Sequence, residues 1–462
     1  MSRHNDIREV LRLAYEKSVA YLDGLESRPV APSPEAIRNL LCLDIPLPEN
    51  PSDPKEALEL LDKYGTPATA STAGSRFFGF VTGGSLPAAL AADWLTSAWD
   101  QNSGLYHVTP ATAHVEAVAL RWLLDLLHLP PDTAGAFVTG TTVANFVALV
   151  AARNAVLQRV GWDVREQGLQ GAPPITVYLG QEAHPVVYKD LALLGIGTKQ
   201  VVEIDVDTQG RMRAESLPQP IGPTIVIAQV GNVNTGSCDP MNVICDRVAG
   251  TNAWVHVDGA FGLWAATAPD RRHLVAGVER ADSWATDAHK WLNVPYDSGI
   301  AFVKDREVLR RAMAVTAAYL PTETEFRNPS DYTPELSRRA RGVSLWAALY
   351  SLGRTGVADL IERTCRYAEM FANGLRRHGF EVLNDVVLNQ VLVSFGSREM
   401  TERVTAVLCE EGTAWCGTTE WQGQFAMRIS ISSWATTEED VEKSLVAMMR
   451  VAERARAEAK AQ

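Results

Sequence analysis

The residues most able to do chemistry are a lysine and an aspartate that precedes it in the chain. Lys290 follows a histidine in the stretch 287–291 (DAHKW), and Asp258 comes directly after the apolar run 253–257. A desolvated lysine amine can form a Schiff base, and a carboxylate can pair with the nitrogen of a pyridine ring. The two residues together indicate pyridoxal 5′-phosphate (PLP), whose ring the carboxylate would turn into an electron sink.

Each of these residues also has an ordinary explanation. Lys290 could be a surface lysine in a loop, and Asp258 could cap the next helix. The flanking sequence favours the chemical interpretation, because Lys290 lies in a small-residue turn between apolar stretches. The run before Asp258 has the character of a buried parallel strand, which would place the carboxylate where open α/β sheets bind ligands. Gly259 would then let a flat ring approach the backbone.

Two further segments fit a PLP site. Thr141 and Thr142 lie in a Gly/Thr turn between an apolar segment and a helical one, where backbone N–H groups and hydroxyls can bind a phosphate. His184 follows the apolar stretch 175–179 and could stack on a pyridine ring. Such turns often bind nothing, and a lone histidine at a strand end is usually structural. Both segments therefore count only as members of the set.

The motifs resemble, in order and spacing, those of the group II PLP-dependent amino acid decarboxylases of fold type I, such as aromatic-L-amino-acid decarboxylase. The resemblance covers nearly the whole chain and includes segments 77–80, 111–116, 141–145, 258–260, 289–291, 338–341 and 427–430. It implies an α/β fold with a large domain, built on a mostly parallel central sheet, and a small C-terminal α+β domain. It also implies PLP as cofactor and a homodimer with shared active sites.

The same resemblance implies roles for single residues. Lys290 would hold the cofactor and donate or accept protons, His184 would stack over the ring opposite Ala260, and Asp258 would bind the ring nitrogen. The other implied cofactor residues are Thr141, Thr142 and His289 at the phosphate and Asn232 near the ring hydroxyl. The substrate-binding candidates are Phe78, Phe80, Leu105, Tyr106 and Arg428. Arg428 could instead form a salt bridge at a strand edge, and the apolar candidates could be core residues.

The chain departs from the family in the loop 319–332. The decarboxylases carry a loop tyrosine that protonates the product carbanion, whereas this loop is a few residues shorter and places Pro329 near that position. Tyr332 becomes the candidate proton donor. The leading hypothesis is decarboxylation of an L-amino acid, with an aromatic or apolar side chain favoured. Retro-aldol cleavage of a β-hydroxy amino acid and transamination stay open, as does a PLP-free scaffold without enzymatic activity.

Composition indicates a multidomain enzyme acting on a small molecule. The chain has 462 residues, of which 46% are hydrophobic, enough for a large core. A net charge of −12 argues against nucleic acid or an anionic membrane as the main partner. The six cysteines lack metal-ligand spacing, so we expect no metal site and free thiols. No signal peptide or membrane-spanning segment is apparent, and a cytoplasmic location is expected.

Changes of pattern divide the chain into three parts. Residues 1–75 hold an amphipathic helix and a Pro-rich run, which we expect to pack on a partner subunit, although a loose arm is the alternative. Residues 76–355 alternate strands and helices and form the expected PLP-binding domain, and residues 356–462 form the small domain. The expected strands are 135–139, 175–179, 200–203, 224–229, 253–257, 283–287 and 299–303, with 381–383, 391–395 and 426–431 in the small domain.

Overall fold

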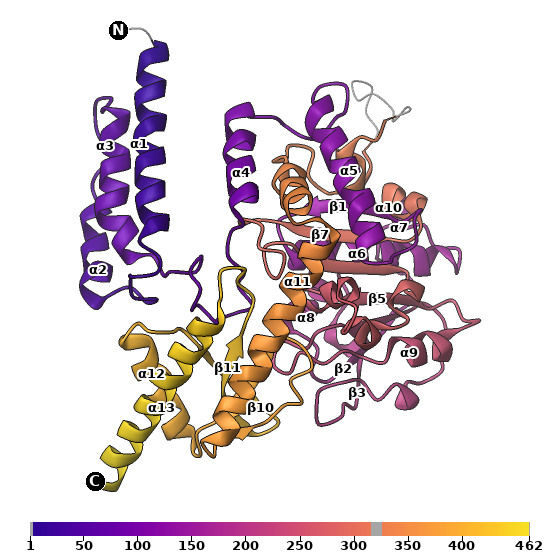
Figure 1. Ribbon diagram of the computed structural model, residues 1–462. Helices are drawn as coiled ribbons and strands as arrows, with labels where there is room; N and C mark the ends of the chain where they lie inside the picture. The colour runs from indigo at the N-terminus through magenta and orange to yellow at the C-terminus, as the bar shows by residue number, and fades with distance from the viewer. Residues whose placement is uncertain (1–2, 316–325, 462) are drawn as a thin grey trace.

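The computed structural model describes residues 3–315 and 326–461 of the chain. Figure 1 shows an N-terminal helical arm that projects from a large α/β body, with a smaller layered part at the C-terminal end. The expected α/β fold with a mostly parallel central sheet is confirmed. No helix among the described residues is both long and apolar enough to cross a membrane.

The central sheet has seven strands, each within one or two residues of a strand expected from the sequence. In spatial order they are β1 (Ala134–Val138), β7 (Gly299–Val303), β6 (Ser283–Asp287), β5 (Trp254–Asp258), β4 (Thr224–Gln229), β2 (Thr176–Gly180) and β3 (Val201–Ile204). Strand β7 runs antiparallel to both of its neighbours, and the other pairs are parallel. The carboxyl ends of β2, β4, β5 and β6 therefore meet at one edge of the sheet.

Both faces of this sheet are buried, which explains the continuous apolar runs of its central strands. Along β4, Val226 and Ala228 pack into a core on one face, whereas Ile225 and Ile227 pack into a core on the other. The helices of this part are α4 (Pro87–Trp99), α5 (Pro110–Leu126), α6 (Thr141–Gln158), α7 (Val164–Gln167), α8 (Pro185–Leu193), α9 (Met241–Val248), α10 (Arg306–Met313) and the first half of α11 (Arg341–Arg377).

The C-terminal part is built on a second, antiparallel sheet. Its strands, in spatial order, are β10 (Gly417–Trp421), β11 (Gln424–Ser430), β9 (Gln390–Ser394) and β8 (Glu381–Val382), and its helices are α12 (Arg398–Glu410), α13 (Glu438–Ala461) and the second half of α11. Helix α11 is interrupted at Gly353, whose φ of +61° suits glycine. The break lies close to the boundary predicted near residue 356.

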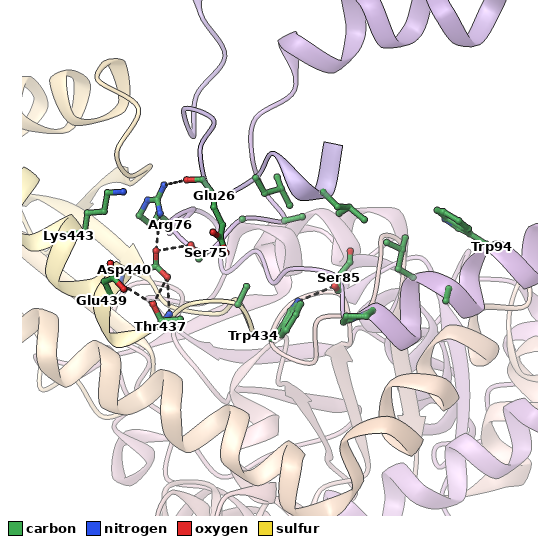
Figure 2. Close-up of a pocket in the computed structure, with 18 residues that line it drawn as sticks. Glu26, Ser75, Arg76, Ser85, Trp94, Trp434, Thr437, Glu439, Asp440 and Lys443 are labelled. Atoms are coloured by element: carbon green, nitrogen blue, oxygen red, sulfur yellow. Dashed lines mark hydrogen bonds and ion pairs between the residues drawn. The ribbon is translucent and has the colours of Figure 1, made fainter. Parts of the chain in front are cut away.

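The N-terminal arm consists of α1 (Arg3–Asp23), α2 (Pro34–Asn39) and α3 (Pro54–Leu60), and it meets the body at Arg76. The Arg76 guanidinium donates to the Glu26 carbonyl oxygen and pairs with Asp440 at 2.9 Å (Figure 2). It also donates to the Thr413 carbonyl oxygen. A cavity of about 630 Å³ lies beside this junction, between the arm, α4 and the start of α13. The three contacts of Arg76 join segments that are far apart in the sequence.

Candidate active site

A cavity of about 920 Å³ opens at the carboxyl edge of the central sheet. It brings together most of the residues expected at a PLP site. Those that line it are Phe80, Thr141, Thr142, His184, Asp258, Ala260, His289, Lys290 and Arg428. Strands β5 and β6 supply Asp258 and the segment before Lys290, the first turn of α6 supplies the threonines, and β11 supplies Arg428.

The Lys290 amine is held by a buried carboxylate that the sequence interpretation did not assign. Lys290 Nζ lies 3.1 Å from Asp287 Oδ2, and Asp287 is 2% exposed at the end of β6. The other oxygen, Asp287 Oδ1, accepts the Thr141 N–H at 2.7 Å and lies 3.5 Å from His289 Nε2. One carboxylate thus connects the lysine, the histidine before it and the N-terminus of α6.

The N-terminus of α6 fits a phosphate group. Thr141 Oγ1 is buried and has no hydrogen-bond partner among the described residues. The Thr141 hydroxyl group can therefore donate a hydrogen bond to a phosphate oxygen. Backbone N–H groups at a helix start attract anions. Gly140 precedes the helix, and a Cβ at this position would be tightly packed at 3.2 Å from His289 Cε1. The 18-residue helix therefore begins with an open, polar cradle.

His289 is fixed as a neutral imidazole at this end of the cavity. Its Nδ1 accepts the Ser298 N–H at 3.1 Å, so the ring proton is on Nε2 and points towards Asp287. Burial lowers the pKa of His289, although the Asp287 carboxylate partly opposes the effect. The ring of Tyr296 stacks on His289 with ring centroids 4.3 Å apart.

Asp258 and His184 form the end of the cavity suited to a pyridine ring. Asp258 is 6% exposed, and its Oδ1 accepts the Ala260 N–H at 3.2 Å. His184 precedes α8, and its Nδ1 accepts the Val186 N–H at 3.3 Å, which leaves the ring proton on Nε2. Burial lowers the pKa of His184, and Asp258 opposes this shift. A neutral, flat imidazole is therefore present beside the carboxylate.

Phe80 and Arg428 face the cavity from other parts of the chain. Phe80 is 62% exposed with a φ of +54°, and its ring lies 5.3 Å from that of Trp415. Arg428 Nη1 donates to Asn234 Oδ1 at 3.4 Å, and burial lowers its pKa. Among the described residues Arg428 forms no ion pair, so the strand-edge salt bridge is not found and the guanidinium is available for a carboxylate.

Two of the expected substrate and proton-transfer residues are placed elsewhere, and we correct both. Phe78 is 1% exposed and packs on Phe371 in the core of the C-terminal part, so it cannot line the substrate wall. Tyr332 is fully buried in the core beside the central sheet, with the Arg327 guanidinium 4.1 Å from its ring centroid. A side chain enclosed in this way does not reach the cavity. Residues 319–325 of the same loop lie outside the described part of the chain.

The expectation for Asn232 is also corrected. Its Oδ1 accepts the N–H groups of Asn234 and Thr235, and its amide donates to the Glu182 carbonyl at 3.3 Å. The side chain therefore shapes the turn, and its neighbour Asn234 lines the cavity instead. Leu105 and Tyr106 are half-buried, and neither lines the cavity of its own chain. The ring of Tyr106 stacks on that of Phe326, with centroids 4.3 Å apart.

The sequence interpretation missed Asp287 and Asn145. Asp287 had a usable signal, because it ends a predicted strand just as Asp258 does. Asn145 donates to Asp258 Oδ2 at 3.3 Å from the first turns of α6. Its role depends on α6 lying against β5, which no local pattern reveals.

Comparison with known proteins agrees with the fold. Residues 42–397 match the family model described as the pyridoxal-dependent decarboxylase conserved domain. The aromatic-L-amino-acid decarboxylase of Bacillus atrophaeus is 27% identical over 94% of this chain and 93% of its own. Tryptophan decarboxylase 1 of Oryza sativa subsp. japonica is 29% identical over 93% and 90%. The crystal structure of Oryza sativa TDC with PLP and tryptamine aligns with a TM-score of 0.90, at 25% identity, over 97% of this chain and 98% of that one.

These findings define an α/β PLP-dependent enzyme of fold type I. The chain belongs to the pyridoxal-dependent decarboxylase family, and it is a carboxy-lyase that removes carbon dioxide from an amino acid with PLP as its cofactor. The two alternative PLP reactions and the PLP-free scaffold are not favoured.

Proposed function

We propose that this enzyme decarboxylates an aromatic L-amino acid to the corresponding amine. The observation that carries the proposal is the single cavity in which Lys290 and Asp258 lie together with the exposed ring of Phe80. The names of the two relatives that match more than nine-tenths of this chain, an aromatic-amino-acid and a tryptophan decarboxylase, support an aromatic substrate.

The cavity residues divide into groups by the part of the cofactor they would hold. Lys290 would hold PLP covalently, and Asp258 would bind the ring nitrogen. His184 and Ala260 would lie on the two faces of the ring. The phosphate would be held by Thr141, Thr142 and His289. PLP supplies the electron sink for the bond that breaks when carbon dioxide leaves.

The chain's own residues orient the substrate and move the proton. Arg428 binds the substrate carboxylate through its planar guanidinium, and Phe80 contacts the aromatic side chain. With Tyr332 enclosed in the core, Lys290 is the side chain of the cavity best suited to deliver a proton to the carbon that loses carbon dioxide. His184 carries its proton on Nε2 and can hydrogen-bond to substrate oxygen atoms.

We also propose that the enzyme is a homodimer with shared active sites. The arm exposes large apolar residues that a partner subunit would cover, among them Ile7, Leu11, Leu41 and Leu47. Leu105 and Tyr106, which do not face their own cavity, would complete the substrate wall of the partner's. The cysteines of the described residues are free thiols, which fits a reducing compartment such as the cytoplasm.

The test is a panel of carboxyl-labelled L-amino acids given to the PLP-loaded enzyme, with carbon dioxide and all other products followed by mass spectrometry. We expect labelled carbon dioxide and the matching amine from aromatic substrates. Glycine with an aldehyde, a keto acid, or amine from acidic substrates alone would overturn the proposal. Lys290→Ala is the control, and it should lose both the Schiff-base absorbance and turnover.

A further inference from the structure

A chain of buried side chains leads from the protein interior to Asp258. Trp254 Nε1 lies 2.8 Å from Ser283 Oγ, and Ser283 Oγ lies 2.8 Å from His256 Nδ1. His256 Nε2 lies 2.9 Å from Asn145 Oδ1, and Asn145 Nδ2 lies 3.3 Å from Asp258 Oδ2. The four residues behind Asp258 are at most 2% exposed, so water does not compete for these bonds.

The direction of the hydrogen bonds around His256 is fixed from the Asp258 end of the chain. The Trp254 indole can only donate, so the Ser283 oxygen accepts from it. At the other end the carboxylate of Asp258 can only accept. Asn145 must therefore present its NH₂ group to Asp258 and its oxygen to His256. His256 Nε2 must then donate to the Asn145 oxygen, and the unprotonated Nδ1 of the neutral ring accepts the Ser283 hydroxyl hydrogen.

The tautomer is maintained because His256 stays neutral. The ring is completely buried, and this burial lowers the pKa of His256 to about 3. The hydrogen-bond chain thus has one arrangement across the physiological pH range, and it always directs a donor at Asp258.

We propose that this hydrogen-bond chain holds Asp258 as an oriented carboxylate and thereby keeps the ring nitrogen of bound PLP protonated. Its members are Trp254, Ser283, His256 and Asn145, which act as positioning residues. The inference rests on the proposed role of Asp258 at the ring nitrogen. In a buried pair of carboxyl and pyridine groups, the proton moves to the carboxyl oxygen unless donors stabilise the carboxylate. Asn145 supplies such a donor on Oδ2, and the Ala260 N–H supplies one on Oδ1.

The test measures the cofactor, not turnover, in Asn145→Leu, which keeps the volume but removes the donor. We expect the dissociation constant for PLP to rise about 10- to 100-fold, the value of one hydrogen bond to a charged group. We also expect the ¹⁵N resonance of ¹⁵N-labelled PLP in the holoenzyme to move towards that of an unprotonated pyridine nitrogen. The control is Asn154→Leu on the same helix, a residue that contacts Arg153 and lies outside the cavity.

A pair of histidine variants separates the hydrogen-bond chain from packing. His256→Leu should reproduce the weaker PLP binding and the ¹⁵N shift, whereas His256→Gln, which carries both a donor and an acceptor, should recover part of each. If Asn145→Leu does not fold, this pair decides the question. Wild-type PLP affinity and an unchanged ¹⁵N resonance in the folded Asn145→Leu or His256→Leu holoenzyme would overturn the proposal. These measurements need no substrate, so failure to decarboxylate aromatic amino acids would overturn only the proposed function.

Discussion

Lys290 and Asp287 form an ion pair of 3.1 Å within the PLP cavity. The amine that must attack the cofactor is therefore held by a carboxylate that also accepts the first N–H of α6. A lysine attacks a carbonyl group through the lone pair of its nitrogen, and an amine paired with a carboxylate must leave that partner before it can attack. Asp287 consequently restrains Lys290 until the cofactor enters.

Asp287→Asn should make PLP load faster at pH 7. The amide keeps an oxygen for the Thr141 N–H, but it no longer forms the ion pair with Lys290 or repels the cofactor phosphate. We expect an increase of about 2- to 10-fold in the loading rate, in line with a modest, partly exposed ion pair. Stopped-flow absorbance of the Schiff base, on apoenzyme mixed with PLP, measures it.

The control for this experiment is Asp297→Asn. Asp297 pairs with Arg341 at 2.7 Å instead of with Lys290, so its loss should leave the loading rate unchanged. A rate that stays the same or falls in Asp287→Asn would show that the ion pair does not restrain the lysine.

Phe80→Ala should change substrate preference more than it changes PLP binding. The exposed ring of Phe80 lines the cavity and packs against Trp415. Removing it should lower kcat/KM for tryptophan or tyrosine by about 10-fold or more, because the aromatic contact and its apolar area are lost. Tyr350→Ala, an exposed aromatic residue stacked on Trp346, is the control. Unchanged ratios across the amino acid panel would argue against Phe80 as a substrate contact.

The sequence predicts the central sheet well because its strands are buried on both faces. A continuous apolar run such as β4 needs no tertiary information to be identified. Strand β10 had no counterpart among the expected strands. Its residues alternate between half-buried and exposed, and it lies at the edge of the small sheet, where an apolar run is not required.

The sequence predicts site residues that directly follow a strand. It does not predict residues whose side-chain direction depends on the local backbone conformation. Lys290 and Asp258 lie in the expected cavity because strand ends converge at one edge of the sheet. Phe78 and Phe80 are two positions apart, but Phe78 is buried and Phe80 is exposed. The local backbone conformation causes this difference. The Phe78 N–H bonds to the Trp415 carbonyl and its ring enters the core, whereas the left-handed φ of Phe80 turns its ring outwards. Neither feature leaves a signal in composition or spacing.

Tyr332→Phe should retain most decarboxylase activity. Tyr332 is fully buried with the Arg327 guanidinium over its ring, and phenylalanine preserves that contact. We expect kcat to stay within about threefold of wild type, whereas loss of a general acid typically costs 10²–10⁴-fold. Single-turnover release of labelled carbon dioxide and of the amine measures both halves of the reaction. Carbon dioxide release without amine formation in this variant would restore Tyr332 as the proton donor.

Asp190→Asn should remove a pH-dependent loss of stability. Asp190 is completely buried on α8, and neither of its carboxyl oxygens has a hydrogen-bond partner among the described residues. Burial raises the pKa of Asp190 to about 7, and the Asp258 carboxylate adds to the effect. The folded protein thus keeps a proton that the unfolded chain loses near pH 4, so the free energy of unfolding falls as the pH rises from about 4 to about 7.

Above pH 7 this decrease in the free energy of unfolding is complete. It amounts to at most about 4 kcal/mol, because burial raises the pKa of Asp190 from its usual value near 4 to about 7. Thermal unfolding at pH 5 and pH 8 should therefore show that Asp190→Asn gains Tm relative to wild type as the pH rises. Asp359→Asn, which changes an exposed carboxylate paired with Arg363 on α11, provides the control and should follow the wild-type slope. Parallel curves for Asp190→Asn and wild type would mean that Asp190 ionises in the folded protein as readily as in the unfolded chain.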